Sequence, residues 1–299
     1  MRELALQFGP EGALSGVLTE APDSGIGVAI LSAGITHRVG PNRLHVSLAR
    51  ALSQRGFPTL RFDFSGVGES EAATDQDSYE VRTDREVRAA LDVIGSKTGA
   101  DRFLLVGLCS GADNALRAAL RDPRVAGAVL IEGYAFGSRG YRLEYYARRC
   151  VRPETWGRLL YGRISLADVA AGLSGIRHRR AAPASEPDDA ARFWRMPPRE
   201  RIVADLRELA RRGTELLLVN TRHSPSEYNF RRIVRPELRS EPLRGLVETK
   251  VFHDADHTFS RPGMRAELIE LIADWAHRRF GRTPTTRAHL PPVSALAAF

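Results

Sequence analysis

The side chains best suited to covalent chemistry lie in one pentapeptide, Gly107-Leu108-Cys109-Ser110-Gly111. An apolar run precedes it and an amphipathic segment follows it, as in a strand that turns sharply into a helix. Such a corner holds a side chain exposed above the strand, where a thiol or hydroxyl can attack a carbonyl carbon. We therefore expect a nucleophile in this turn. A structural turn that carries a buried, unreactive cysteine is the alternative.

Two side chains in this turn are candidate nucleophiles, and their neighbours favour the cysteine. Strand and helix backbones approach closely at such a corner, so the residues two before and two after the nucleophile must be small. Cys109 has Gly107 and Gly111 at these positions, whereas Ser110 has the bulky Leu108 before it. The spacing G-x-C-x-G thus predicts Cys109 as the nucleophile. Ser110 then contributes its backbone N–H rather than its hydroxyl.

A cysteine nucleophile needs a base and hydrogen-bond donors for the developing oxyanion. His257 is the predicted base, because it follows a strand expected over 248–253 and so lies at the same sheet edge as the pentapeptide. The N–H of Ser110, at the start of a helix, is one predicted oxyanion donor. The second is the N–H of Ile35, where Gly34 gives the backbone room to turn toward the site. A simple tight turn is the alternative for this loop.

The other histidines and the acidic residues indicate no metal site. His37 and Gly34 lie on the loop that carries Ile35 and are candidate substrate contacts, with an ordinary polar loop residue as the alternative for His37. No group of histidine, cysteine and aspartate has the spacing of a metal-ligand set. We expect neither a metal nor another cofactor.

Strand-like and helix-like segments alternate through the first half of the chain and again near its end. Short apolar runs are typical of strands buried on both faces, and apolar residues every three or four positions are typical of helices. The alternation predicts an α/β fold with a mostly parallel, doubly wound sheet after two paired N-terminal strands. The expected strands are 3–8, 13–19, 27–32, 58–64, 103–106, 125–131, 215–220 and 248–253, and the expected helices are 41–55, 78–94, 112–120, 199–212 and 263–279.

The alternation breaks over residues 137–200, where glycines and prolines separate helical patterns. We predict a helical cap inserted into a core made of residues 1–136 and 201–282, since such insertions usually cover the ligand crevice. Residues 283–299 contain three prolines and are predicted to be a disordered tail. The stretch 138–213 holds seventeen arginines, no lysine and nine acidic residues. The predicted cap is therefore basic. It could be a surface on which an acidic ligand docks, and an ordinary solvated face is the alternative.

Together these features resemble the α/β-hydrolase family over nearly the whole chain. The matching segments are the turn 107–111, the loop 33–36, the D-x-x-G-x-G-x-S stretch 63–70 and the tripeptide Ala255-Asp256-His257. The G-x-C-x-G form resembles the cysteine branch of that family, such as dienelactone hydrolases and acyl-CoA N-acyltransferases. The resemblance implies an α/β-hydrolase fold with an inserted cap, and nucleophile, acid and histidine in that order along the chain.

The sequence departs from the family where the catalytic acid is expected. The family carries an aspartate on the loop after the strand 215–220, and here Ser224 stands at that position and is a candidate substrate contact instead. Glu227, three residues further on, is one candidate acid. Glu132 is another, because some members carry the acid after the strand 125–131. Both candidate acids stay open. A thiol depends less on such an acid than a hydroxyl does, because its thiolate readily forms an ion pair with imidazolium.

These residues predict an acyl-transfer enzyme of thioesterase or acyltransferase type, in which Cys109 attacks a thioester or ester and His257 moves the proton. The basic cap suits an acidic donor that bears phosphate, such as coenzyme A or an acyl carrier protein. One alternative is a serine ester hydrolase that uses Ser110. Another is a hydrolase-fold docking module that binds an acylated carrier without turnover.

Composition indicates which partners and which cellular compartment to expect. Arginine carries almost all of the net charge of +8, yet no known nucleic-acid-binding motif is present, so no nucleic-acid partner is expected. No apolar stretch approaches the roughly 18–20 residues of a membrane span, and the first residues do not resemble a signal peptide. Two cysteines are too few for a disulfide framework. This composition favours a reducing, cytoplasmic setting.

Overall fold

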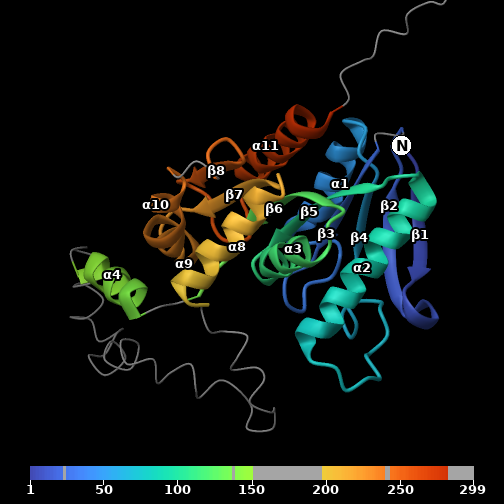
Figure 1. Cartoon of the computed structure of the whole chain (residues 1–299), viewed down its shortest axis with the longest axis horizontal. Coiled ribbons are helices and arrows are strands. Elements are labelled where there is room, and N and C mark those ends of the chain that lie inside the picture. The colour runs from blue at the N-terminus through green and yellow to red at the C-terminus, as the bar shows by residue number, and fades with distance from the viewer. Residues whose placement is uncertain (23–24, 137–138, 151–196, 240–242, 282–299) are drawn as a thin grey trace, which may run out of the picture.

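One sheet of eight strands forms the centre of the chain, in the order β1-β2-β4-β3-β5-β6-β7-β8 (Figure 1). The computed structural model describes residues 1–22, 25–136, 139–150, 197–239 and 243–281. The β1–β2 and β2–β4 pairs are antiparallel, and the pairs from β4 to β8 are parallel. The strands are β1 Glu3–Phe8, β2 Leu14–Thr19, β3 Ile26–Leu31, β4 Thr59–Phe62, β5 Arg102–Leu108, β6 Val125–Ile131, β7 Glu215–Thr221 and β8 Val247–Phe252.

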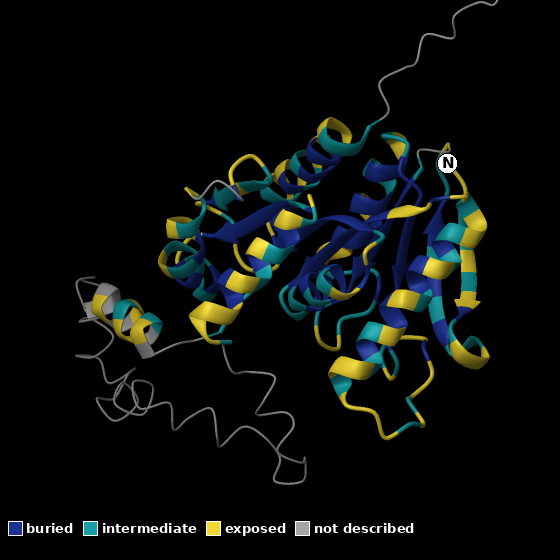
Figure 2. Cartoon of the chain, in the orientation of Figure 1, coloured by how far each residue is buried: buried dark blue, intermediate teal, exposed yellow. Residues whose placement is uncertain are grey.

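The central strands are apolar because both faces of the sheet are covered. Every residue of β3, β4 and β6 is buried, and Figure 2 shows these strands as a dark band between the helices. Continuous apolar runs are expected where a parallel strand is buried on both sides. The predicted α/β fold with a mostly parallel, doubly wound sheet is confirmed.

The helices divide between the two faces of the sheet. On one face, α1 (Leu44–Gln54) and α11 (Pro262–Phe280) pack on β3, β5 and β6. On the other face lie α2 (Tyr79–Thr98), α3 (Ser110–Arg121) and α8 (Arg199–Arg211). Each helix turns one apolar stripe toward the sheet, as its spacing of apolar residues predicts.

The connection from β7 to β8 contains helical turns that the sequence patterns did not reveal. They are α9 (Pro225–Asn229), the π-helical turn η4 (Phe230–Val234) and α10 (Arg235–Glu237). These turns follow one another without a break and pack beside α8 through η4. They place a run of arginines close to the edge strand β8.

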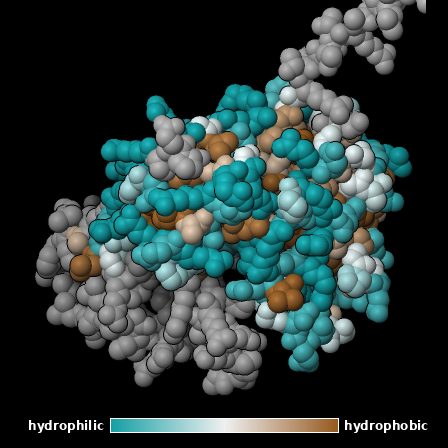
Figure 3. Space-filling view, viewed as in Figure 1, coloured by the Kyte–Doolittle hydropathy of each residue, from teal (hydrophilic) through white to brown (hydrophobic). Residues whose placement is uncertain are grey.

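Part of the predicted cap and all of the predicted tail lie outside the described residues. Helix α4 (Arg139–Cys150) belongs to the predicted cap 137–200 and contacts α9, whereas residues 151–196 and the tail 283–299 are not described. Hydrophilic residues cover most of the described surface seen in Figure 3, with smaller apolar patches between them. Among the described helices, none has both the length and the apolar character needed to cross a membrane.

Candidate active site

Cys109 occupies the sharp corner between β5 and α3. Its backbone angles are φ 54° and ψ −121°, a conformation that costs free energy for any residue with a side chain. The residue before it ends β5 and the residue after it begins α3. The side chain is half-buried, with Cys109 N–H donating to the carbonyl oxygen of Ile131 at 2.8 Å. A strained cysteine is thus held at the carboxyl edge of the sheet.

The two glycines around Cys109 allow the close packing at this corner. A Cβ atom on Gly107 would overlap the backbone of Gly111, and one on Gly111 would overlap the carbonyl oxygen of Leu31. Neither obstacle is the flexible end of a side chain, so neither can move away cheaply. The backbone contacts that motivated the choice of Cys109 over Ser110 are therefore present in the structure.

His257 lies beside Cys109, on the loop after β8. It is hydrogen-bonded to Cys109, and its Nδ1 lies 3.1 Å from Oε2 of Glu132. Because Nδ1 faces the carboxylate, Nε2 is the nitrogen that faces the thiol. The hydrogen bond with Cys109, followed by that with Glu132, raises the pKa of His257 to about 10. This environment favours a protonated imidazole.

Glu132 is fully buried directly after β6, where the chain turns with a φ of 55°. One carboxylate oxygen accepts hydrogen bonds from the backbone N–H of Thr221 and from Oγ of Ser224, the latter at 3.2 Å. The other oxygen contacts His257. Three donors therefore surround the buried carboxylate and compensate for its loss of water.

The turn that carries Glu132 is fastened on two sides. On one side Oδ1 of Asp113, one helical turn after Cys109, accepts the N–H of Tyr134 at 2.9 Å. On the other side Ser226 donates its hydroxyl hydrogen to the carbonyl oxygen of Gly133. Burial raises the pKa of Asp113 to about 6. Asp113 escaped the sequence analysis, although an aspartate in the first turn of the helix that follows the predicted nucleophile is a signal that could have revealed it.

Ser224, at the position where the resemblance expects an aspartate, donates its hydroxyl hydrogen to the carboxylate of Glu132. The same hydroxyl accepts the N–H of Glu227 at 3.0 Å and so caps α9. The predicted substrate contact by Ser224 gains no support from this placement. Its two hydrogen bonds connect the loop after β7 to the residue that faces His257.

Glu227 lies away from the imidazole, and its placement does not support the prediction that it is the acid. Its carboxylate pairs with Arg231 at 3.7 Å, one helical turn along the same segment. The cause is local: Ser224 and Glu227 have the spacing of a capping box, and Pro225 suits the first turn of a helix. These signals could have shown that Glu227 starts a helix and points along it.

The predicted oxyanion loop lies against the start of α3. Gly34 N–H donates to Oγ of Ser110 at 2.8 Å, and Thr36 N–H closes a turn on Ala33 at 2.8 Å. The side chain of Ile35, between them, is 94% exposed. The structure thus brings Gly34, Ile35 and Ser110 together, with the Ser110 hydroxyl accepting a hydrogen bond from the loop.

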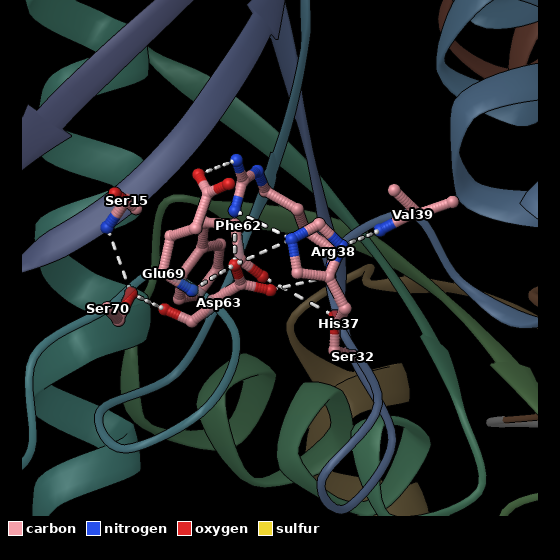
Figure 4. Close-up of polar contacts among 9 residues, drawn as sticks. All are labelled: Ser15, Ser32, His37, Arg38, Val39, Phe62, Asp63, Glu69 and Ser70. Atoms are coloured by element: carbon pink, nitrogen blue, oxygen red, sulfur yellow. Dashed lines mark hydrogen bonds and ion pairs between the residues drawn. The ribbon is translucent and has the colours of Figure 1, made fainter.

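His37 belongs to a polar network rather than to the surroundings of Cys109 (Figure 4). Its Nδ1 accepts the N–H of Val39 at 3.2 Å, and its Nε2 lies 3.5 Å from Oδ2 of Asp63 and 3.0 Å from Arg38. Asp63 is fully buried, and Arg38 bridges it to Glu69. Both ring nitrogens of His37 are engaged, so the predicted substrate contact is not supported.

The same network accounts for the D-x-x-G-x-G-x-S stretch. Asp63 accepts the backbone N–H of Glu69 at 3.2 Å, and its carbonyl oxygen accepts the hydroxyl of Ser70 at 2.6 Å. A Cβ on Gly68 would overlap the Asp63 carboxylate, so the second glycine of the stretch leaves no room for a side chain. Among the described residues, no group of three or more His, Cys, Asp and Glu side chains is arranged to hold a metal ion.

Comparison with known proteins agrees with this architecture. The family profile described as alpha/beta hydrolase fold matches residues 39–201. An esterase of Pyrococcus furiosus superposes with a TM-score of 0.62 at 16% identity, over 94% of this chain and 92% of that one. Proline iminopeptidase of Mycobacterium smegmatis gives 0.57 at 14% identity, over 92% and 98%. Dienelactone hydrolase of Anabaena variabilis gives 0.53 at 16% identity, over 94% and 99%. No curated protein sequence matches the chain.

Proposed function

Given that the chain belongs to the alpha/beta hydrolase fold family and is a hydrolase-fold enzyme, we propose that it transfers acyl groups through Cys109. The observation that carries the proposal is the row of contacts from Cys109 through His257 to Glu132. A thiol, an imidazole and a buried carboxylate in contact in this order support nucleophilic catalysis by Cys109. The strained backbone at Cys109 holds the sulfur at the corner where a carbonyl can approach.

The first half of the reaction forms an acyl-enzyme. The Cys109 thiolate attacks the carbonyl carbon of a thioester or ester, and the carbonyl oxygen becomes an oxyanion. The backbone N–H groups of Ser110 and Ile35 are the proposed donors to it. As the intermediate collapses, the bond to the leaving thiol or alcohol breaks. The leaving group takes the proton from Nε2 of His257, and Cys109 carries the acyl group.

The second half returns the enzyme to its starting state. Water, an amine, an alcohol or a thiol gives its proton to Nε2 of His257 as it attacks the acyl-cysteine. Glu132 holds Nδ1 throughout, which fixes the ring and stabilises its positive charge. When the second intermediate collapses, the acyl group leaves with the acceptor. The sulfur departs as a thiolate beside the imidazolium, so the ion pair is restored.

A thioester donor suits this site best. Exchange of one thioester for another is close to isoenergetic, so a thiol nucleophile forms its acyl-enzyme without a large uphill step. We propose a soluble acyl thioester, or an ester, as the substrate, with a phosphate-bearing carrier as its leaving group. A cytoplasmic setting belongs to this proposal, because reducing conditions keep an active-site thiol free.

Intact-mass spectrometry tests the proposal directly. After incubation with acyl thioesters and activated esters, the protein should gain the mass of one acyl group, and Cys109→Ala should abolish this gain. Ser110→Ala should retain it, with a slower rate because the hydrogen bond from Gly34 is lost. An adduct that disappears in Ser110→Ala but persists in Cys109→Ala would show a serine hydrolase. A folded protein that takes up no acyl group from any donor would point to a docking module.

A further inference from the structure

A groove of about 810 Å³ lies between the edge strand β8 and the segment from α9 to α10. Its lining combines arginines with a few apolar side chains. Arg222 and His223 directly follow β7, and His253 directly follows β8, so one end of the groove lies at the carboxyl edge of the sheet. Cys109 lies at the same edge, after β5. The groove is separate from the contacts among the candidate catalytic residues.

The distance from this groove to Cys109 suits a long ligand. The sheet order places β8 three strands from β5. Neighbouring strands lie about 4.8 Å apart, so β8 lies roughly 14 Å from β5 across the sheet. About four extended residues, or a flexible linker of that length, would span this gap. One ligand could therefore occupy the groove and present a carbonyl to Cys109.

The charge of the groove is strongly unbalanced. Four arginines line it against one carboxylate, that of Glu227. Arg231 is already paired, with Glu227 at 3.7 Å and Glu144 at 2.7 Å. The other three, Arg222, Arg235 and Arg239, are exposed and have no ion-pair partner in the part of the chain that the structure describes. Three guanidinium groups are thus available to an anionic ligand.

A second groove is also lined by arginines but has no comparable excess of positive charge. It lies between α2 and α3 and is lined by Arg85, Arg88 and Arg121. Two aspartates also line it, Asp84 and Asp122. Arg121 pairs with Asp84, and Arg85 pairs with carboxylates outside the groove. The groove beside β8 differs because its arginines lack such carboxylates.

The apolar part of the lining narrows the class of ligand. Phe230, Leu238 and Val251 are partly buried and form the apolar part of the lining. Guanidinium groups bind phosphate oxygens through paired N–H donors, and they also stack on flat rings. Apolar surface beside several guanidinium groups suits a ligand with an aromatic ring and more than one phosphate. A volume of this size accommodates such a small molecule.

We propose that this groove binds the nucleoside diphosphate portion of the acyl donor, while its acyl thioester reaches Cys109. The assignment to an acyl donor rests on the proposed function, whereas the binding of a diphosphate does not. Arg222 lies nearest to the catalytic edge in the chain, directly after β7, and Arg235 and Arg239 hold the far part. The groove would then select donors by their carrier, independently of the acyl group.

Titration calorimetry on full-length Cys109→Ala tests binding without turnover. ADP and pyrophosphate should bind, adenosine should bind at least tenfold more weakly than ADP, and added salt should weaken ADP binding. Arg235→Gln/Arg239→Gln should weaken ADP at least tenfold. The matched control, Arg88→Gln/Arg102→Gln, removes the same charge from exposed positions elsewhere and should leave ADP binding within twofold. Absent ADP binding, or equal affinity in the two double variants, overturns the site.

Acylation rates on the Cys109 enzyme test the link to the reaction. For a thioester that carries a nucleoside diphosphate, Arg235→Gln/Arg239→Gln should lower kcat/KM at least tenfold. For a thioester of N-acetylcysteamine, which has no phosphate, the same variant should react within twofold of the unsubstituted chain. If the phosphate-free donor acylates Cys109 and ADP does not bind, the groove inference fails and the proposed function stands. If ADP binds and no donor acylates Cys109, the proposed function fails and the link to an acyl donor fails with it.

Discussion

Replacing Glu132 by glutamine separates the charge of this side chain from its shape. One carboxylate oxygen accepts from Thr221 and Ser224, and the other faces Nδ1 of His257. Glutamine has a single acceptor oxygen, which the two donors hold on their side, so its NH2 group turns toward His257. Nδ1 must then be unprotonated. The proton of the neutral ring lies on Nε2 and points at Cys109, which is the wrong tautomer for accepting the thiol proton.

The expected loss in rate follows from these contacts. A hydrogen bond to a charged group contributes about 1.5–3 kcal/mol, which corresponds to a rate factor of roughly 10–150. The wrong tautomer adds to this loss, so Glu132→Gln should slow acylation of Cys109 by about 10²–10³-fold at pH 7. The pKa of His257, now raised to about 10, should also fall toward its usual value. His257 then loses its proton at a lower pH, so the alkaline limb of the pH–rate profile should shift to lower pH.

Pre-steady-state acylation, followed by intact mass across pH, measures both effects. The matched control is Glu227→Gln, which makes the same chemical change in the other candidate acid, a residue paired with Arg231. It should react within about threefold of the unsubstituted chain, since it alters an ion pair near the surface. The reasoning is wrong if Glu227→Gln shows the large loss and Glu132→Gln does not. It is equally wrong if Glu132→Gln leaves the alkaline limb in place.

Three further predictions concern stability, each measured by urea unfolding. Gly107→Ala should lower the free energy of unfolding by at least about 3 kcal/mol, because the added Cβ would overlap backbone atoms. Gly34→Ala should lower it by only about 1 kcal/mol, because Gly34 has a φ of 49° but open space around it. Equal losses in the two variants would contradict this packing. The folded state raises the pKa of Asp113 from 3.8 to about 6, so its ionisation reduces stability as pH rises from about 4 to 6. Asp113→Asn should remove that decline, worth roughly 3 kcal/mol by pH 7, and an unchanged slope would refute it. Asp63→Ala should cost about 3–5 kcal/mol, because it leaves the little-exposed Arg38 guanidinium with only the exposed Glu69 carboxylate as a partner and removes the acceptor of two backbone N–H groups. A loss below about 1 kcal/mol would show that the network matters little.

The sheet could be predicted from sequence because strand burial is written into apolar runs. The strand predicted over 125–131 has these bounds in the structure, and the strand 3–8 does as well. The helix predicted over 78–94 continues to Thr98, where Gly99 in the left-handed region ends it. Gly99 was visible in the sequence, but the polar last turn of the helix carries no apolar pattern. Periodicity thus locates an element better than its end.

The site was harder to predict where it depends on the direction of a loop. Cys109 and His257 follow strands, so topology alone brings them to one edge of the sheet. The choice between Glu132 and Glu227 depends on whether the loop after β7 runs toward the imidazole or begins a helix. The segment 225–237 has little apolar periodicity and contains several arginines, so no helix was predicted there. Its turns, and the groove they form with β8, required the structure.

The hydrogen bond from Ser224 to Glu132 has a consequence for recognising related sites by motif. A search that requires aspartate on the loop after β7 would classify this chain as lacking an acid. Here a carboxylate from the adjacent strand reaches the histidine, and the residue at the aspartate position supports that carboxylate. In this chain the carboxylate follows β6 and the hydroxyl that supports it follows β7. A search based on the position of the carboxylate oxygen relative to the imidazole would find the acid whether it follows β6 or β7.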